Sequence, residues 1–362
     1  MKKILTVAGV LLAALAAFGA YRLYDLHQRR EAAHVAFQAK MAAWPGARSS
    51  VSFAYKGPNG RHVFLAGEMT DWDHEKIAMV RGEDGVWRTS VLLPPGQWLY
   101  KFVVDGEWMA DPENPLSDKD GQGGRHSYLL LGEGDWIVPA GAPHGSIKTF
   151  NSPAGTLTNV YLPPGYEAGK PYPLLVLLHG SGADADQWYR TGMVDRFMDS
   201  MIARGVLQPF LIVMPSVGHG YGGENEAAII GRLLPLLKQE YGVSLKTSET
   251  AISGMSMGGF GAFYLAYQHP DIFGLSIPVS GVYREPYLAS LARPVRLPFK
   301  LEILCGSSDF LIDDNRALQR LLRADGVAFN YQESNGGHEW HYWNAQLPSI
   351  LSRANRFFQT GK

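Results

Sequence analysis

The chain has a single cysteine, Cys305, among its 362 residues. One cysteine excludes an internal disulfide, and neither a C-x-x-C pair nor an H-E-x-x-H stretch is present to suggest a zinc site. We therefore expect neither a metal nor a cofactor. Cys305 ends an apolar run, which favours a buried small residue over a reactive thiol.

The chain also lacks an excess of charge of either sign. Its 33 Lys and Arg residues face 34 Asp and Glu residues, and the net charge is −1. Binding to nucleic acid through phosphates needs a basic stripe, and none is present, so we expect no nucleic-acid partner. There is no internal repeat or low-complexity segment, and the length predicts two globular domains rather than one core.

The N-terminus carries an uncharged, strongly apolar run directly after two lysines. Lys2 and Lys3 precede residues 4–20, which contain no charged side chain. This layout predicts a signal peptide or signal anchor over residues 1–20, and an exported protein that is periplasmic or extracellular and either free or anchored in the membrane. No cysteine follows the run, which excludes lipoprotein processing. Charged and apolar residues alternate over 21–47, which predicts a helical stalk.

One motif carries the strongest chemical signal, a serine two residues from a glycine on each side: Gly254, Ser256 and Gly258. This G-x-S-x-G spacing is typical of a nucleophile elbow, a sharp strand-to-helix turn in which only glycines let the flanking backbones approach. Residues 249–253 are predicted to form a strand, and the aromatic spacing over 259–269 predicts a helix. Ser256 is therefore the candidate nucleophile.

A nucleophilic serine needs a histidine base and a carboxylate that orients it, in the chain order Ser, Asp or Glu, His. Asp309 follows a predicted strand over 300–305, at the strand end where open α/β sheets hold their site residues. His338 follows the turn Asn335-Gly336-Gly337. We expect Asp309 to be the orienting acid and His338 the general base.

Other residues compete for these roles. Asp313 and Asp314 lie near Asp309, but their positions are typical of the first turn of a helix, where carboxylates are stabilising. His341 could share a helix face with His338, but a metal pair would need a third ligand. His179 ends a predicted strand over 174–178, and we expect it to shape the following loop.

The oxyanion of an acyl-transfer intermediate needs backbone N–H donors. In this arrangement one donor follows the nucleophile, here Met257, and the other comes from the loop after the third strand, here Ser181 or Gly182; which of the two points inward stays open. Several aromatic residues and a histidine could line a substrate pocket: Trp188, Tyr189, His219, Tyr221, Trp340 and Trp343. Trp340 and Trp343 fit equally well as core residues of the final helix.

From about residue 145 onward, the chain resembles an esterase family of α/β hydrolases that includes feruloyl esterases, siderophore (enterochelin) esterases, S-formylglutathione hydrolases and mycolyltransferases. The resemblance implies the same nucleophile, acid and base that the chain order indicates. One departure is Asn159, where relatives often have arginine. The matching segments are residues 160–166, 172–180, 254–259 and 336–340, together with Asp309 and Asn315.

Residues 50–131 alternate apolar side chains between Gly, Pro and Asp turns, which predicts a small antiparallel β-sandwich. They also resemble the glycogen-binding module of AMP-activated kinase β subunits and the N-terminal domains of branching enzymes, through residues 63–67, 70–72, 85–87, 95–108 and 111–112. The resemblance implies glucan binding by Trp72, Lys101 and Trp108, although His126 replaces an asparagine of the family. Packing beside the hydrolase, at the mouth of its pocket, is the favoured alternative.

Together these patterns predict an α/β-hydrolase fold with a mostly parallel, doubly wound sheet over residues 150–362. An immunoglobulin-like β-sandwich is expected over 48–132, with a linker at 133–149. The predicted function is an exported serine esterase acting on feruloyl- or acetyl-type esters of carbohydrates. Alternatives are a siderophore esterase, an acyltransferase and, in a different class, an inactive glucan-binding protein.

Overall fold

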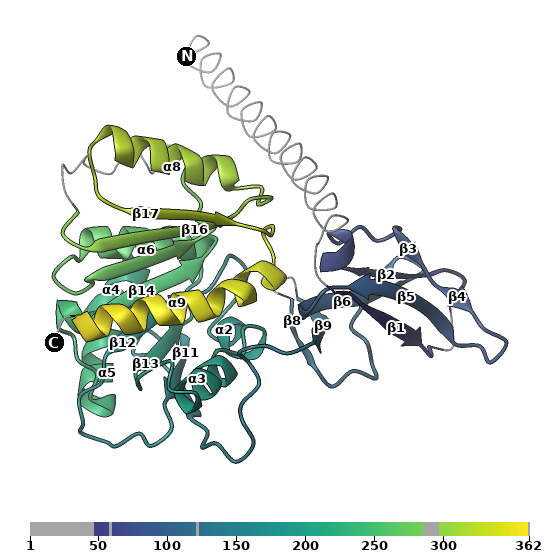
Figure 1. Ribbon diagram of the computed structural model, residues 1–362, viewed down its shortest axis with the longest axis horizontal. Coiled ribbons are helices and arrows are strands. Elements are labelled where there is room, and N and C mark those ends of the chain that lie inside the picture. The colour runs from purple at the N-terminus through teal and green to yellow at the C-terminus, as the bar shows by residue number, and fades with distance from the viewer. Residues whose placement is uncertain (1–46, 58–59, 121–122, 285–296, 361–362) are drawn as a thin grey trace, which may run out of the picture.

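The structure is a computed structural model that describes residues 47–57, 60–120, 123–284 and 297–360. The expected signal segment at 1–20, and the stalk at 21–47 except for its last residue, lie outside the described residues. Within the described ranges, no helix is both long and apolar enough to cross a bilayer. Figure 1 shows two bodies side by side, a sheet-rich N-terminal part and a larger part with helices on both faces of a sheet.

The N-terminal part is a sandwich of two antiparallel sheets, as the alternation of its sequence predicts. Along the central strand, Trp98 and Phe102 point into the sandwich core, whereas Leu99 packs into the core of the other domain. The sheets have the orders β1-β5-β4 and β3-β2-β6-β9-β8, with β7 paired to β6. The strands are β1 (Ser49–Tyr55), β2 (Val63–Gly67), β3 (Ile77–Ala78), β4 (Val80–Arg81), β5 (Trp87–Leu93), β6 (Gly96–Val104), β7 (Glu107–Met109), β8 (Ser117–Lys119) and β9 (Arg125–Leu131), and the short helix η1 (Glu68–Thr70) follows β2.

The second part is built on an eight-stranded sheet with the order β10-β11-β13-β12-β14-β15-β16-β17. From β13 to β17 the neighbouring strands are parallel, and the strand order reverses on either side of β12. Such a reversal is the point where open α/β sheets place their sites. The strands are β10 (Ser146–Asn151), β11 (Leu157–Leu162), β12 (Leu174–Leu178), β13 (Leu211–Pro215), β14 (Thr250–Met255), β15 (Leu275–Val279), β16 (Lys300–Gly306) and β17 (Asn330–Ser334).

Helices cover both faces of this sheet because its central strands are apolar on both sides. In β12, Leu174, Val176 and Leu178 pack with residues of α5, α6 and α8, whereas Leu175 and Leu177 pack with residues of α3 and α9. The helices are α2 (Asp186–Arg190), α3 (Val194–Ala203), α4 (Glu224–Ala228), the π-helical turn η2 (Ile229–Leu233), α5 (Leu234–Tyr241), the 3-10 turn η3 (Thr247–Glu249), α6 (Met257–Gln268), α8 (Ile312–Ala324) and α9 (Trp340–Thr360).

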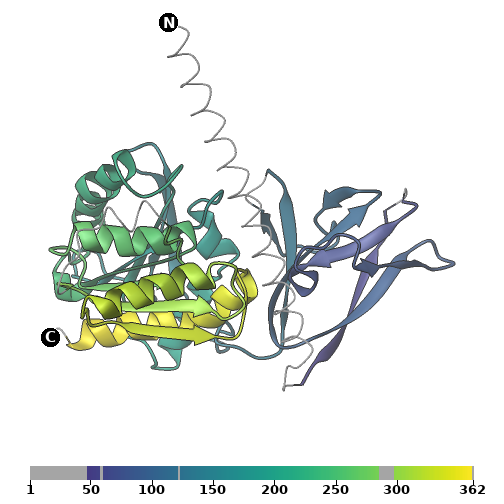
Figure 2. The same ribbon diagram turned by 90° about the horizontal axis from the view of Figure 1, so that it is seen from above.

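The two parts meet where β6 packs against α9. Figures 1 and 2 both show the sandwich beside the eight-stranded sheet, with the N-terminal end of α9 directed toward it. Gln97 donates its Nε2–H to the carbonyl oxygen of Thr191 at 2.7 Å, and Thr191 donates its hydroxyl to Asp118 at 2.7 Å. Both contacts are buried, so they join the two domains without water between them.

Candidate active site

Ser256 lies in the turn between β14 and α6, with φ 56° and ψ −117°. A non-glycine residue rarely adopts this backbone conformation, and such strain is typical of functional turns. The flanking glycines explain how the turn closes. A Cβ at Gly254 would lie 2.5 Å from the carbonyl oxygen of Gly258, and a Cβ at Gly258 would lie 2.5 Å from that of Leu178. The sequence motif therefore folds as the sharp strand-to-helix turn that its spacing predicts.

Ser256, His338 and Asp309 form one hydrogen-bonded chain. Nε2 of His338 lies 2.9 Å from Oγ of Ser256. Nδ1 of the same ring lies 2.9 Å from Oδ2 and 3.0 Å from Oδ1 of Asp309. Because a carboxylate can only accept, Nδ1 carries the proton, which leaves Nε2 free to accept the serine hydroxyl. The structure thus brings together three side chains that the sequence places far apart.

The surroundings of His338 hold its ring in place. Asp309 is fully buried after β16, and its Oδ1 also accepts the N–H of Leu311 at 2.7 Å. The imidazole packs between Phe310, with a ring-centre distance of 4.4 Å, and Trp343, at 5.0 Å. These contacts fix the orientation of the His338 imidazole and the Asp309 carboxylate in the absence of any ligand.

The competing carboxylates lie elsewhere. Asp313 and Asp314 are in the first turn of α8, as their positions in the sequence predict. Asp314 accepts a hydrogen bond from Nε of Arg284 at 2.9 Å, so it belongs to an ion pair on that helix.

The loop after β12 passes beside Ser256. A Cβ at Gly180 would lie 3.7 Å from the Cβ of Ser256, and the N–H of Gly180 is engaged by Oε1 of Gln187 at 3.1 Å. Ser181 and Gly182 follow in exposed positions, and Gly182 has φ +76°. Met257 begins α6, so its N–H is among the first amides of that helix, which have no partner within the helix. The expected donors are therefore grouped on the two backbone segments that flank the serine.

His179 shapes this loop, as expected. Its Nδ1–H donates to the carbonyl oxygen of Gly180 at 2.7 Å, and its Nε2 accepts the N–H of Val217 at 3.0 Å. Both ring nitrogens are thus occupied by backbone. Burial lowers the pKa of His179, which keeps the ring neutral.

The structure corrects part of the expected aromatic pocket. Trp188 and Tyr221 are each 1% exposed, and they donate to the carbonyl oxygens of Leu178 and His179 at 2.8 and 2.9 Å. They are core residues, because an aromatic ring with a polar edge is stable inside when that edge finds an acceptor. Trp340 is buried edge-on against Trp188, in line with the core alternative, and His219 is exposed. Trp343 is the member of the group whose ring contacts His338.

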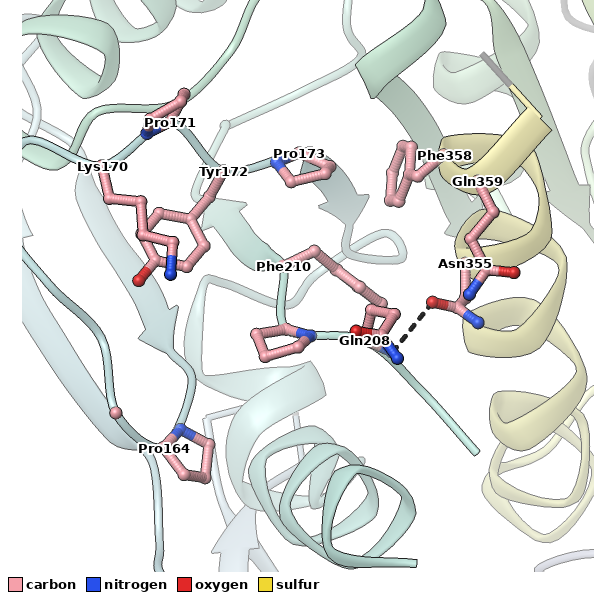
Figure 3. Close-up of a pocket in the computed structure, with 12 residues that line it drawn as sticks. Pro164, Lys170, Pro171, Tyr172, Pro173, Gln208, Phe210, Asn355, Phe358 and Gln359 are labelled. Atoms are coloured by element: carbon pink, nitrogen blue, oxygen red, sulfur yellow. Dashed lines mark hydrogen bonds between the residues drawn. The ribbon is translucent and has the colours of Figure 1, made fainter. Parts of the chain in front are cut away.

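A cavity of about 240 Å³ lies at a different place in the hydrolase part. Its lining residues come mainly from the segments before β12 and β13 and from the end of α9 (Figure 3). The cavity therefore opens at the amino ends of these strands, whereas Ser256 follows the carboxyl end of β14. Within it, the N–H of Gln208 donates to Oδ1 of Asn355 at 3.0 Å. The lining includes Pro164, Lys170, Tyr172, Gln208, Phe210 and Phe358, none of which belongs to the serine–histidine–aspartate chain.

The candidate sugar-binding side chains of the sandwich are only partly exposed to solvent. Trp108 is 42% exposed, and its ring centre lies 6.4 Å from that of Trp72, which also packs on the hydrolase core. Lys101 is nearly buried and forms an ion pair with Asp120. His126 is buried beside them, and burial lowers its pKa to about 4. The structure therefore brings the two tryptophans together but engages the ammonium group elsewhere.

His341 has a structural role at the domain interface. Its ring stacks on Trp98 with centres 4.1 Å apart, and its Nδ1–H donates to the carbonyl oxygen of Gln97 at 3.0 Å. Burial lowers the pKa of His341 to about 4. Across the described part of the chain, no group of three His, Cys, Asp or Glu side chains is arranged to hold a metal ion.

Sequence reasoning missed Glu68, a buried acid at this interface. Its Oε1 accepts the N–H of His341 at 3.0 Å, and its Oε2 accepts the N–H of Leu99 at 2.9 Å. Burial raises the pKa of Glu68 to about 7. Nothing in the sequence near residue 68 signals this contact, because its partner lies in the last helix.

Comparison with known proteins identifies both parts. Residues 155–287 match the family described as "Putative esterase", and residues 49–135 match the glycogen recognition site of AMP-activated protein kinase. The chain is 27% identical over 304 residues to an endo-1,4-beta-xylanase/feruloyl esterase of Xylanibacter ruminicola. That match covers 75% of this chain, more than the hydrolase part alone, and 40% of the relative. The chain therefore spans less than half the length of this relative.

Solved structures agree with the fold. A ferulic acid esterase is 26% identical and has a TM-score of 0.54, covering 59% of this chain and 99% of that one. The enterobactin esterase of Shigella flexneri, solved in the presence of enterobactin, is 20% identical with a TM-score of 0.66 and covers 86% of this chain and 94% of that one. The predicted fold class is confirmed, and the proteins that this chain resembles are described as esterases. Residues 155–287 thus form a domain of the esterase family with the α/β-hydrolase fold, and they are preceded by a domain of the glycogen-recognition type.

Proposed function

We propose that the chain is an exported serine esterase that cleaves carboxylic esters through an acyl-enzyme on Ser256. The observation that carries this proposal is the continuous chain of hydrogen bonds from Ser256 through His338 to the buried Asp309. A serine hydroxyl is a weak nucleophile unless a positioned base removes its proton.

The reaction follows from these positions. Oγ of Ser256 attacks the ester carbonyl carbon while Nε2 of His338 takes the hydroxyl proton. The tetrahedral intermediate then collapses, and His338 returns that proton to the departing alcohol. Water repeats the sequence and releases the acid. Asp309 holds the Nδ1–H tautomer and stabilises the imidazolium that forms in each half-reaction.

The oxyanion would be stabilised by backbone N–H groups on either side of the serine. Met257 opens α6, so its amide combines a donor with the positive end of the helix dipole. The second donor comes from Ser181 or Gly182. The engagement of the Gly180 amide by Gln187 supports a donor further along that loop.

Feruloyl- or acetyl-type esters of carbohydrates are the substrate class that we favour. Relatives of this chain include an endo-1,4-beta-xylanase/feruloyl esterase and an acetyl esterase, the latter from Caldicellulosiruptor saccharolyticus. The sandwich of the glycogen-recognition type, with its exposed Trp108, also supports a carbohydrate ester.

Three other functions are candidates. The likeness of both domains to an enterobactin esterase supports a siderophore ester as substrate, and transfer of the acyl group to another alcohol would use the same residues. A glucan-binding protein without activity belongs to a different class. The complete hydrogen-bonded chain at Ser256 argues against it.

The deciding experiment uses feruloyl, acetyl, short-chain aryl and siderophore esters with the wild-type chain and Ser256→Ala. We expect turnover to fall by about three orders of magnitude or more in the variant, with its unfolding temperature unchanged. A fluorophosphonate probe, which reacts with activated serines, should label Ser256 in wild type as read by peptide mass spectrometry. Equal hydrolysis by the variant would remove the assignment.

We also propose that the chain is divided into a sandwich over 48–132, a linker over 133–149 and a hydrolase over 150–362, following an export signal at 1–20 and a stalk at 21–47. The uncharged run after Lys2 and Lys3 supports export. Fractionation of cells, combined with N-terminal sequencing of the recovered protein, tests both export and cleavage. Recovery of the uncut chain from the cytoplasm would contradict the proposal.

A further inference from the structure

A single carboxylate ties the sandwich to the start of the last helix. Glu68 lies in η1, directly after β2, and is 1% exposed. Its Oε2 accepts the N–H of Leu99 in β6, and its Oε1 accepts the N–H of His341 in the first turn of α9.

The first turn of a helix has amides without partners in the helix, and a negative charge there is stabilising. In α9 the N–H of His341 receives its acceptor, Glu68, from the other domain. The acid nearest in sequence, Glu339, uses its Oε1 for the N–H of Gly337 at 2.7 Å. Glu339 therefore holds the turn before His338, and Glu68 holds the helix after it.

The position of His338 depends on both sides of this segment. The preceding turn is tightly packed, since Gly336 has φ +140° and a Cβ there would lie 2.5 Å from the ring of Tyr342. His338 is two residues before the start of α9, so a shift of that helix start moves the imidazole relative to Ser256. Misplacement of a catalytic group by about 1 Å can slow a reaction by about two orders of magnitude.

Packing of the two domains against each other would not by itself require Glu68. Gln97, Thr191 and Asp118 already join the domains through buried hydrogen bonds. A buried carboxylate is costly, and here it is retained where it accepts two buried backbone N–H groups, one in each domain. Burial raises the pKa of Glu68 to about 7, and burial beside Glu68 raises the pKa of Glu339 well above its usual range.

We propose that Glu68 is a positioning residue for the general base, and that the sandwich is thereby a working part of the catalytic site. The carboxylate fixes the first turn of α9 and so holds Nε2 of His338 at hydrogen-bond distance from Ser256. This inference rests on the proposed function, because it assumes that His338 activates Ser256.

The test compares Glu68→Ala, Glu68→Gln and the control Asp118→Asn in the full chain. Asp118 is equally buried at the same interface, but it contacts Thr191 rather than α9. For Glu68→Ala we expect kcat on an aryl ester to fall by about tenfold or more while KM changes by less than about twofold, because the geometry of the base is disturbed and substrate binding is not. Phosphonylation of Ser256 by a fluorophosphonate should slow by the same factor.

The conservative variant provides a rescue. Glu68→Gln keeps one oxygen, which can still accept the N–H of His341, so we expect it to recover most of the lost kcat. Asp118→Asn should retain kcat within about twofold even if its unfolding temperature falls as far as that of Glu68→Ala. If Glu68→Ala does not fold, Glu68→Asp replaces it: a carboxylate one methylene shorter should also lower kcat without changing KM.

Two results would overturn the inference. One is that the variant used, Glu68→Ala or Glu68→Asp, has the same kcat and the same labelling rate as wild type. The other is a loss in Asp118→Asn equal to that in the Glu68 variants, which would show a general effect of the interface. Failure of the proposed function looks different, because Ser256 would then be unlabelled, or Ser256→Ala fully active, whatever residue occupies position 68.

Discussion

Glu68 and His341 lie 273 positions apart in the chain, yet the carboxylate of the first accepts the backbone N–H of the second at 3.0 Å. The same histidine stacks on Trp98 of the sandwich. A Cβ at Gly96 would lie 2.6 Å from its ring, so the close approach requires glycine there. The start of the last helix thus packs against the N-terminal domain, a few residues from His338.

The first prediction concerns the stability of this contact with pH. Below pH 4.5 the carboxyl of Glu68 is protonated in both the folded and the unfolded chain. Between pH 4.5 and about 7 the unfolded chain loses this proton and the folded chain keeps it, so the free energy of unfolding falls as pH rises. Relative to Glu68→Gln, wild type should lose up to about 3 kcal/mol across this window.

Urea unfolding of both proteins at pH 5 and pH 8 measures this difference. Glu107→Gln is the control, because it removes the same kind of side chain at an exposed position of the same domain. The difference in the free energy of unfolding between Glu107→Gln and wild type should be the same at both pH values. A constant gap between wild type and Glu68→Gln at the two pH values would contradict the prediction.

The second prediction concerns the orienting acid. Asp309→Asn should lower kcat by about 10⁴-fold, because an amide does not hold the Nδ1–H tautomer of His338. Steady-state kinetics on an aryl ester, with the unfolding temperature as a check on folding, is the measurement. Asp314→Asn in α8 is the matched control, and it should keep kcat within about twofold because Asp314 pairs with Arg284. Comparable losses in both variants would remove Asp309 from its role.

The third prediction concerns the turn at the serine. Gly258→Ala would place a Cβ 2.5 Å from the carbonyl oxygen of Leu178 and should destabilise the fold by about 1–3 kcal/mol. Gly231→Ala is the control, because no atom lies within 4 Å of a Cβ at that exposed position in η2. It should instead stabilise the fold slightly. Thermal unfolding of the two variants decides, and equal melting temperatures would contradict the steric explanation.

The fourth prediction concerns the sandwich. If it holds glucan, the sugar should stack on Trp108, because that ring is exposed while Lys101 is engaged by Asp120. Trp108→Ala should then lower retention on insoluble glucan by about tenfold without lowering the unfolding temperature. Val80→Ala, also exposed but on the other sheet, should be retained like wild type. Wild-type protein that passes through the glucan unretained would count against sugar binding by this surface.

Local patterns were enough to predict the fold class and the geometry at Ser256. The G-x-S-x-G spacing predicts a turn whose sterics involve only neighbouring backbone and the adjacent strand, and the structure has that turn. The chain order of Asp309 and His338 follows from strand ends that meet at one edge of a parallel sheet. The alternation along β6 likewise predicts a sandwich, although it does not tell which face meets another domain.

Three features depended on packing across the chain. Trp188 and Tyr221 are residue types that often line pockets, yet their polar groups donate to backbone carbonyl oxygens inside the core. Lys101 has the position of a sugar ligand, yet Asp120 engages it. In each case the residue type suits two environments, and the choice between them is made by neighbours that are distant in sequence.

The sequence by itself determined the residues of the candidate site: a serine in a glycine-flanked turn, followed by an acid and a histidine in the order that an α/β-hydrolase sheet brings together. This was possible because turn sterics and strand periodicity act over a few residues. The tertiary structure alone decided that Glu68 of the sandwich reaches the helix start beside His338. A buried carboxylate goes where unpaired amides lie, and the location of those amides is set only when the two domains pack.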